Sequence, residues 1–171
     1  MAKQPDFYLF TDGSADTINK VGVGAYLLLS SLIDSPKQEV VKTKKFKNTS
    51  STKLEIETLI WALTENHLEN KKVVVYTDSQ NIVGLLGRRI RLEKNNFISK
   101  NGRDLKNKEL YIRFYELFDS MDLVSFIVEM EQVIEDLTSK EIQLASEKAM
   151  SRRTSPFISL ESLSIFIKEL L

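Results

Sequence analysis

The segment VVVYTDSQNIVGLL, residues 73–86, decides the fold. Its first part, Val73 to Thr77, is a short run of β-branched and aromatic residues, which is typical of a buried strand. Asp78 and Ser79 follow, and such residues favour the N-terminus of a helix because their side chains accept hydrogen bonds from its first turn. We therefore expect a helix through Leu86. This alternation of strand and helix predicts a parallel strand pair in the middle of a sheet.

Three further strands and one helix are expected before this segment. Phe7–Thr11, Gly22–Leu29 and Val40–Phe46 read as strands of an antiparallel meander, with a turn at Ser35-Pro36 between the last two. Thr52–Asn70 changes to a helical period. Ser51 or Thr52 is a plausible N-cap of this helix. One of its faces carries four apolar residues: Ile56, Leu59, Ile60 and Leu63.

The remainder of the chain adds helices and one strand. After a polar, irregular stretch at Arg88–Lys106, we expect a helix, a strand and two more helices: Asn107–Phe118, Leu123–Val128, Thr138–Met150 and Ser159–Leu171. The predicted fold class is α/β, with a five-stranded mixed sheet of three antiparallel strands and then two parallel strands, flanked by helices. We expect one domain at residues 1–153 and a C-terminal helical extension, residues 154–171, packed on it.

Composition excludes several kinds of site. The 171 residues suffice for one compact domain, and 42% of them are hydrophobic. The absence of cysteine excludes disulfides, thiolate zinc sites and thiol nucleophiles, so a metal would need oxygen ligands. There is no leader pattern and no apolar run of about 18 residues. We expect a soluble cytoplasmic protein that does not engage a membrane.

The net charge of zero conceals two opposed blocks. Residues 88–108 are mainly basic and residues 116–147 mainly acidic. One interpretation is a basic arm for phosphates beside an acidic pocket for cations. The alternative is a pair of solvated faces.

Three acids are placed where a sheet of this order would gather them. Asp12 follows the first strand, Glu55 lies in the first turn of the first helix, and Asp78 follows the fourth strand. Carboxylates in close contact repel unless a cation neutralises them, so the combination predicts a site for a hard metal ion. Each acid alone also has a structural interpretation, as a turn residue or a helix cap.

The segments FTDGSA (10–15) with GVGAYLLL (22–29), STKLEIETLIWAL (51–63) and VVVYTDSQNIVGLL (73–86) closely resemble the three signature regions of type 1 ribonuclease H. The resemblance covers residues 7–150 and is specific in the first 86. It implies a ribonuclease H-like fold. It also implies that Asp12, Glu55 and Asp78 are catalytic metal ligands.

The resemblance implies a metal-dependent endonuclease that hydrolyses the RNA strand of RNA/DNA hybrids. The cofactors would be two Mg²⁺ ions, with Mn²⁺ as a substitute, clamping the scissile phosphate. We expect a monomer without an obligate protein partner. The implied substrate-binding residues lie in the three signature regions and the basic block: Gly13, Ser14, Ser51, Thr52, Ser79, Arg88, Arg89 and Arg91.

The chain departs from the family pattern in two places. Ser51 and Thr52 stand where the family has two asparagines, and the C-terminal third lacks the usual loop histidine. Strict alignment puts Ile142 at the place of the fourth acid, so we predict that Glu141 serves as the fourth ligand. Two alternatives remain open. The chain could be a catalytically weakened module that binds hybrid or duplex RNA, or a DNA-directed nuclease of the superfamily.

Overall fold

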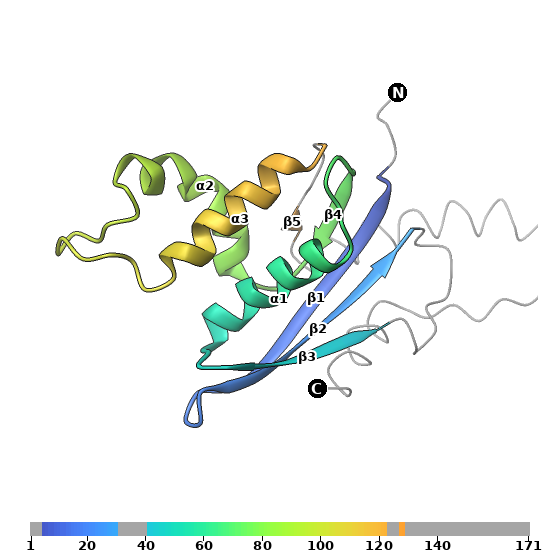
Figure 1. Ribbon diagram of the computed structural model, residues 1–171, viewed down its shortest axis with the longest axis horizontal. Coiled ribbons are helices and arrows are strands. Elements are labelled where there is room, and N and C mark those ends of the chain that lie inside the picture. Colours follow the sequence, from blue (N-terminus) through green and yellow to red (C-terminus); the bar gives the residue numbers. More distant parts are fainter. Residues whose placement is uncertain (1–4, 31–40, 123–126, 129–171) are drawn as a thin grey trace, which may run out of the picture.

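The computed structural model describes residues 5–30, 41–122 and 127–128. Eight elements follow one another along the chain (Figure 1): β1 (Phe7–Asp16), β2 (Val21–Leu29), β3 (Lys42–Lys47), α1 (Ser51–Glu65), β4 (Val73–Tyr76), α2 (Gln80–Lys94), α3 (Lys108–Ser120) and β5 (Ile127–Val128). In these ranges no helix combines the length and apolar character that crossing a membrane requires.

The sheet is mixed, with the strand order β3-β2-β1-β4-β5. β1 pairs antiparallel with β2 and β2 with β3, whereas β4 runs parallel to both β1 and β5. The prediction of an α/β fold with a mixed sheet is therefore confirmed. The predicted number of five strands is confirmed only in part. Four strands make up nearly the whole sheet, because β5 contributes only Ile127 and Val128 among the described residues.

Two predicted boundaries are wrong, the end of the first strand and the N-cap of the first helix. β1 continues past Thr11 to Asp16 because Tyr8–Asp16 pair with β2, so Asp12 lies within the strand instead of after it. The N-cap of α1 is Ser50, whose side chain accepts a hydrogen bond from the backbone N–H of Lys53 at 3.4 Å.

Helix α1 also ends earlier than expected, at Glu65. Just beyond it, His67 adopts a left-handed backbone with φ of 49°, and its N–H donates to the carbonyl of Thr64 at 3.3 Å. A residue in this conformation closes a helix because the chain can no longer continue the α-helical path. The single histidine of the sequence therefore has a structural place at the end of α1.

Helix α2 is longer than predicted. It continues to Lys94, so the first part of the basic block lies on a helix and not in an irregular stretch. Arg91 and Lys94 occupy its last turn, where positive charge is favourable beside the helix dipole. The predicted helices at 138–150 and 159–171, and with them the extension at 154–171, fall outside the described residues.

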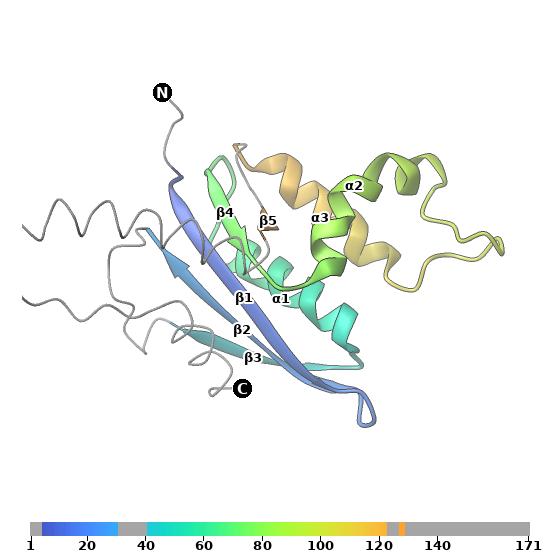
Figure 2. The same cartoon turned by 180° about the vertical axis from the view of Figure 1, so that it is seen from behind.

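Helix α1 packs across β1 and β2 and forms one side of the core. Figures 1 and 2 show α1 in front of the sheet in one view and behind it in the other. The contact is close because Gly24 of β2 lies beneath Thr58 of α1. A Cβ added at Gly24 would lie 2.0 Å from the Thr58 Oγ1, far inside contact distance. Glycine at this position lets the helix approach the sheet.

We predict that Gly24→Ala lowers the free energy of unfolding by about 1–3 kcal/mol, the usual cost of overpacking a core. Adding Thr58→Ala should recover part of that loss because it removes two of the three atoms that the new methyl group would meet. Urea denaturation followed by circular dichroism measures both effects.

Gly87→Ala is the matched control for this substitution. Gly87 lies in α2 with no atom within 4 Å of an added Cβ, so alanine there should be neutral or stabilising by up to about 1 kcal/mol. Equal effects of alanine at the two glycines would contradict the close packing of α1 on β2.

Candidate active site

Asp12 and Asp78 lie just beyond the point where the parallel pairing of β1 with β4 ends. The last aligned pair of these parallel strands is Phe10 with Tyr76. Asp12 follows Phe10 by two positions, and Asp78 follows Tyr76 by two positions. Neighbouring strands are about 4.8 Å apart, so this register brings the two backbones to the same region. It is the carboxyl end of a parallel pair, where open α/β sheets bind their ligands.

Glu55 reaches the same region from the first turn of α1. Its Oε2 accepts a hydrogen bond from the hydroxyl of Ser79 at 2.5 Å, and Ser79 directly follows Asp78. The Ser79 hydroxyl also accepts from the Ile82 N–H at 3.3 Å and so caps α2. One buried serine thus joins the start of α1 to the start of α2 and fixes where Glu55 lies.

Asp12 lies on the other face of the sheet from α1. A Cβ added at Gly13 would lie 3.1 Å from the Leu54 side chain of α1, and successive residues of a strand alternate between faces. The Asp12 Oδ1 accepts a hydrogen bond from the Gly13 N–H at 2.7 Å. Asp12 and Glu55 are half-buried and Asp78 is exposed, so solvent reaches all three.

The three acids suit a hard cation in chemistry but do not form a closed ligand group. All offer carboxylate oxygens, which Mg²⁺ and Mn²⁺ prefer. Within residues 5–30, 41–122 and 127–128, however, no three acidic or imidazole side chains are close enough together to hold an ion. The structure brings Glu55 to the neighbour of Asp78 and leaves Asp12 on the opposite face. The predicted fourth ligand, Glu141, lies outside the described residues.

The predicted substrate contacts differ in exposure. Ser14, Ser51 and Thr52 are exposed, whereas Gly13 is half-buried against α1. Ser79 is buried, and its hydroxyl is occupied by Glu55 and by the α2 backbone, so its place in the structure is that of a positioning residue. The sequence indicates this serine as a helix cap and the resemblance as a substrate contact, but neither reveals its bond to Glu55, which crosses 24 positions.

Two of the three predicted arginine contacts are engaged within the protein. Arg88 donates to the carbonyls of Gly84 and Asn81 at 3.0 and 2.9 Å. Arg89 forms a two-pronged ion pair with Asp119, at 2.6 and 2.7 Å, and its guanidinium lies 5.0 Å from the centre of the Tyr115 ring. Arg91 is exposed and forms no ion pair with any described residue.

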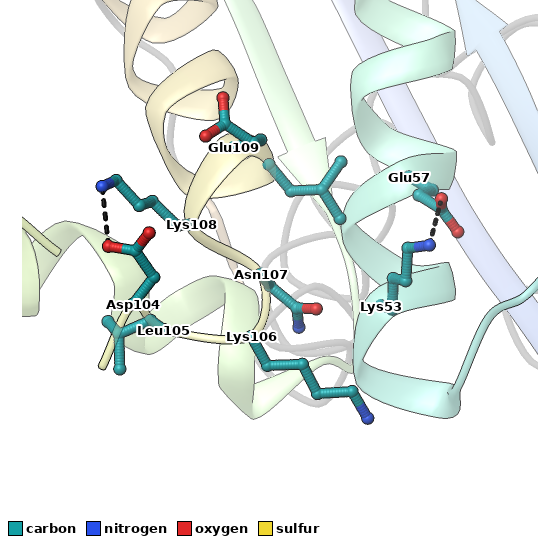
Figure 3. A pocket seen from close by; sticks show the side chains of 9 residues that line it. Lys53, Glu57, Asp104, Leu105, Lys106, Asn107, Lys108 and Glu109 are labelled. Carbon is teal, nitrogen blue, oxygen red and sulfur yellow. Dashed lines mark hydrogen bonds and ion pairs between the residues drawn. The ribbon is translucent and has the colours of Figure 1, made fainter. Parts of the chain in front are cut away.

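A groove of about 450 Å³ lies between the start of α1 and the segment that leads into α3 (Figure 3). Its lining pairs charges internally: Lys53 lies 3.4 Å from Glu57, and Lys108 lies 2.8 Å from Asp104. None of the three predicted metal ligands that the structure describes lines the groove. Its lining has three lysines and three acids: Lys53, Lys106, Lys108, Glu57, Asp104 and Glu109. The charged side chains of the groove therefore sum to no net formal charge.

A mixed sheet with a parallel central pair, and with carboxylates where that pair ends, defines the ribonuclease H-like class of α/β proteins. The RNase H family matches residues 4–130, more than half of the 171 residues, and the chain belongs to this family. The resemblance seen in the sequence is confirmed. Members of this family are, in general, nucleases that act on RNA/DNA hybrids.

One solved structure shares the fold at low identity. It is described as the foamy viral protease-reverse transcriptase in complex with dsDNA. The two chains are 15% identical with a TM-score of 0.58, and the match covers 72% of this chain and 82% of that chain. A comparison with curated proteins finds no match.

The Arg89–Asp119 pair predicts a pH-dependent contribution to stability. Hydrogen bonds from Arg89 hold the pKa of Asp119 below its ordinary value of 3.8. A lowered pKa means that the pair stabilises the fold above 3.8 and that this contribution disappears as the pH falls through the folded-state pKa. Both side chains are partly exposed, at 30% and 56%, so we expect less than about 1 kcal/mol.

Asp119→Asn should therefore lower the melting temperature by up to about 2–4 °C near neutral pH, and by less at a pH below the folded-state pKa of Asp119, where the wild-type carboxylate is itself protonated. Asp122→Asn, which removes an exposed acid nearby, gives the baseline for losing one negative charge. A loss of the same size at both pH values would assign Asp119 a packing role.

Proposed function

We propose that this chain is a metal-dependent endonuclease that hydrolyses the RNA strand of RNA/DNA hybrids. The observation that carries the proposal is the contact of Glu55 with Ser79 beside Asp78, at the end of the β1–β4 parallel pairing near Asp12, in a member of the RNase H family. Asp12, Glu55 and Asp78 would hold the divalent cations, and Glu141 would be the fourth ligand.

The carboxylates bind the cofactor, and the protein supports them. Two Mg²⁺ ions, or Mn²⁺ in their place, would supply charge neutralisation at the phosphate and an activated water. The Ser79 hydroxyl holds the Glu55 carboxylate near Asp78, so this acid needs little rearrangement before a cation binds. The half-buried positions of Asp12 and Glu55 limit hydration and strengthen their attraction for a cation.

Exposed hydroxyls beside the acids suit a nucleic-acid backbone. Ser14 on β1 and Ser51 and Thr52 at the start of α1 can each donate and accept a hydrogen bond. Such groups can recognise phosphates and the 2′-hydroxyl that distinguishes RNA from DNA. We therefore propose the RNA/DNA hybrid as the substrate, bound by a monomer.

The test is cleavage of an end-labelled RNA strand within a hybrid, with Mg²⁺ or Mn²⁺. Asp12→Asn, Glu55→Gln and Asp78→Asn should each reduce the rate by at least about 100-fold, because each removes charge that neutralises the cofactor. Glu141→Gln should do the same if it is the fourth ligand. Glu69→Gln, an exposed acid beyond α1, is the matched control and should keep the wild-type rate.

A second candidate function is binding of hybrid or duplex nucleic acid without efficient cleavage. It is favoured by one observation, that the described acids do not form a closed ligand group. Tight hybrid binding with no cleavage under either metal would overturn the nuclease proposal and establish this one. Equal cleavage of a DNA duplex would instead indicate a DNA-directed nuclease.

A further inference from the structure

The strand register places two lysines on the same face of the sheet as Asp12. Across β1, β2 and β3 the pairing aligns Asp12 with Ala25 and Thr43. Successive rows alternate between faces, so the next row on the face of Asp12, towards the β1–β2 hairpin, is Ser14, Val23 and Lys45, and the one after it is Asp16, Val21 and Lys47. Residues of one row point to the same side, so Lys45 and Lys47 share the face that carries Asp12.

The other lysines of β3 point to the opposite face. Phe46 packs edge-on against Trp61 of α1, with ring centres 6.2 Å apart, and the Lys44 ammonium lies 5.5 Å from the centre of the Trp61 ring. Lys42 lies 3.2 Å from Glu65 of α1. Strand β3 therefore divides its lysines: Lys42 and Lys44 are engaged with α1, and Lys45 and Lys47 face away from it.

The face that carries Asp12 is buried at one end and open at the other. Phe10, Leu27 and Tyr76, on the side of Asp12 away from the hairpin, are at most 8% exposed. Towards the hairpin, Ser14, Lys45 and Lys47 are exposed, and Val21 is 42% exposed. Figure 2 shows this end of β1 and β2 extending beyond the helices. An extended ligand reaching Asp12 can therefore continue over this half of the sheet.

The open half carries three lysines that form no ion pair with a described residue. Lys20 ends the hairpin, and its carbonyl accepts from the Thr49 N–H at 3.1 Å, which ties the hairpin to the turn after β3. Lys20, Lys45 and Lys47 form no ion pair within the described residues. Asp16, in the same row as Lys47, accepts hydrogen bonds from the backbone N–H groups of Ile18 and Asn19, both at 3.0 Å.

We propose that Lys20, Lys45 and Lys47, here called the basic edge, bind the phosphates of the nucleic-acid strand that continues from the reactive phosphate at Asp12. Alternate residues of a strand lie on the same face about 6.8 Å apart, so Lys45 and Lys47 are far enough apart to contact separate phosphates of an extended strand. The inference rests on the proposed function for its substrate. It extends that function to a surface at the edge of the sheet.

Lysines on an edge strand also discourage aggregation, and this role explains their presence without a ligand. That role applies to both faces of β3 equally. Phosphate binding instead predicts a difference between Lys45 and Lys47 on one face and Lys42 and Lys44 on the other, so the second pair is a control on the same strand with the same change of charge.

The experiment measures binding of the full chain to a fluorescent RNA/DNA hybrid in EDTA, which prevents cleavage, over a series of KCl concentrations. For Lys45→Gln/Lys47→Gln we expect the slope of log affinity against log salt to fall by about 1.8, and affinity at moderate salt to fall about tenfold. Lys42→Gln/Lys44→Gln should keep the wild-type slope. Circular dichroism checks that both variants are folded.

Unchanged slopes in both double variants, or equal losses in both, would overturn the basic edge. The outcome is separable from that of the nuclease proposal because binding is read without metal. Suppose that wild type never cleaves the hybrid and that, of the two double variants, only Lys45→Gln/Lys47→Gln lowers the slope of log affinity against log salt. The basic edge then stands and the nuclease proposal fails. If wild type cleaves and neither variant changes its slope, the reverse holds.

Discussion

The parallel pairing of β1 with β4 is the constraint on which the rest of the structure depends. It joins two segments separated by most of the N-terminal half of the chain, and it aligns Phe10 with Tyr76. Their rings stack with centres 4.6 Å apart, which anchors the register on the face away from α1. A shift by one residue would move Asp12 to the other face and separate it from Asp78. The place of the candidate active site thus follows from one strand register.

The packing of α1 on the sheet supplies the third acid. Because Gly24 admits Thr58, the helix lies close to β1 and β2, and its first turn comes near the junction of β4 and α2. There the hydroxyl of Ser79 serves two helices, since it caps α2 and donates to Glu55 of α1. The same contacts that stabilise the fold therefore hold an acid of the site in place, and a loss of packing at the helix would displace it.

Charge in this protein is sorted by tertiary contacts more than by composition. The basic block that begins at Arg88 looks like a phosphate-binding arm in the sequence, yet Arg88 is bound to carbonyls of its own helix and Arg89 to Asp119 of α3. The sequence does not indicate strand β3 as a phosphate-binding segment, because its lysines lie outside the basic block of residues 88–108. Strand β3 nevertheless presents Lys45 and Lys47 on the open face beside Asp12. Positive charge available to a ligand lies at the sheet edge as well as at Arg91.

The sequence by itself determined the order of the elements, the mixed sheet and the family, since hydrophobic period and local motifs such as Thr-Asp-Gly-Ser are properties of neighbouring residues. It also pointed to Glu55 in the first turn of α1 and Asp78 just after β4, but it placed Asp12 after a strand that in fact continues to Asp16. Only the tertiary structure decided which side chains are already engaged. The Arg89–Asp119 pair spans 30 positions, and the face on which Lys45 lies depends on its register with β2. Such contacts join residues far apart in the chain, so no local pattern records them.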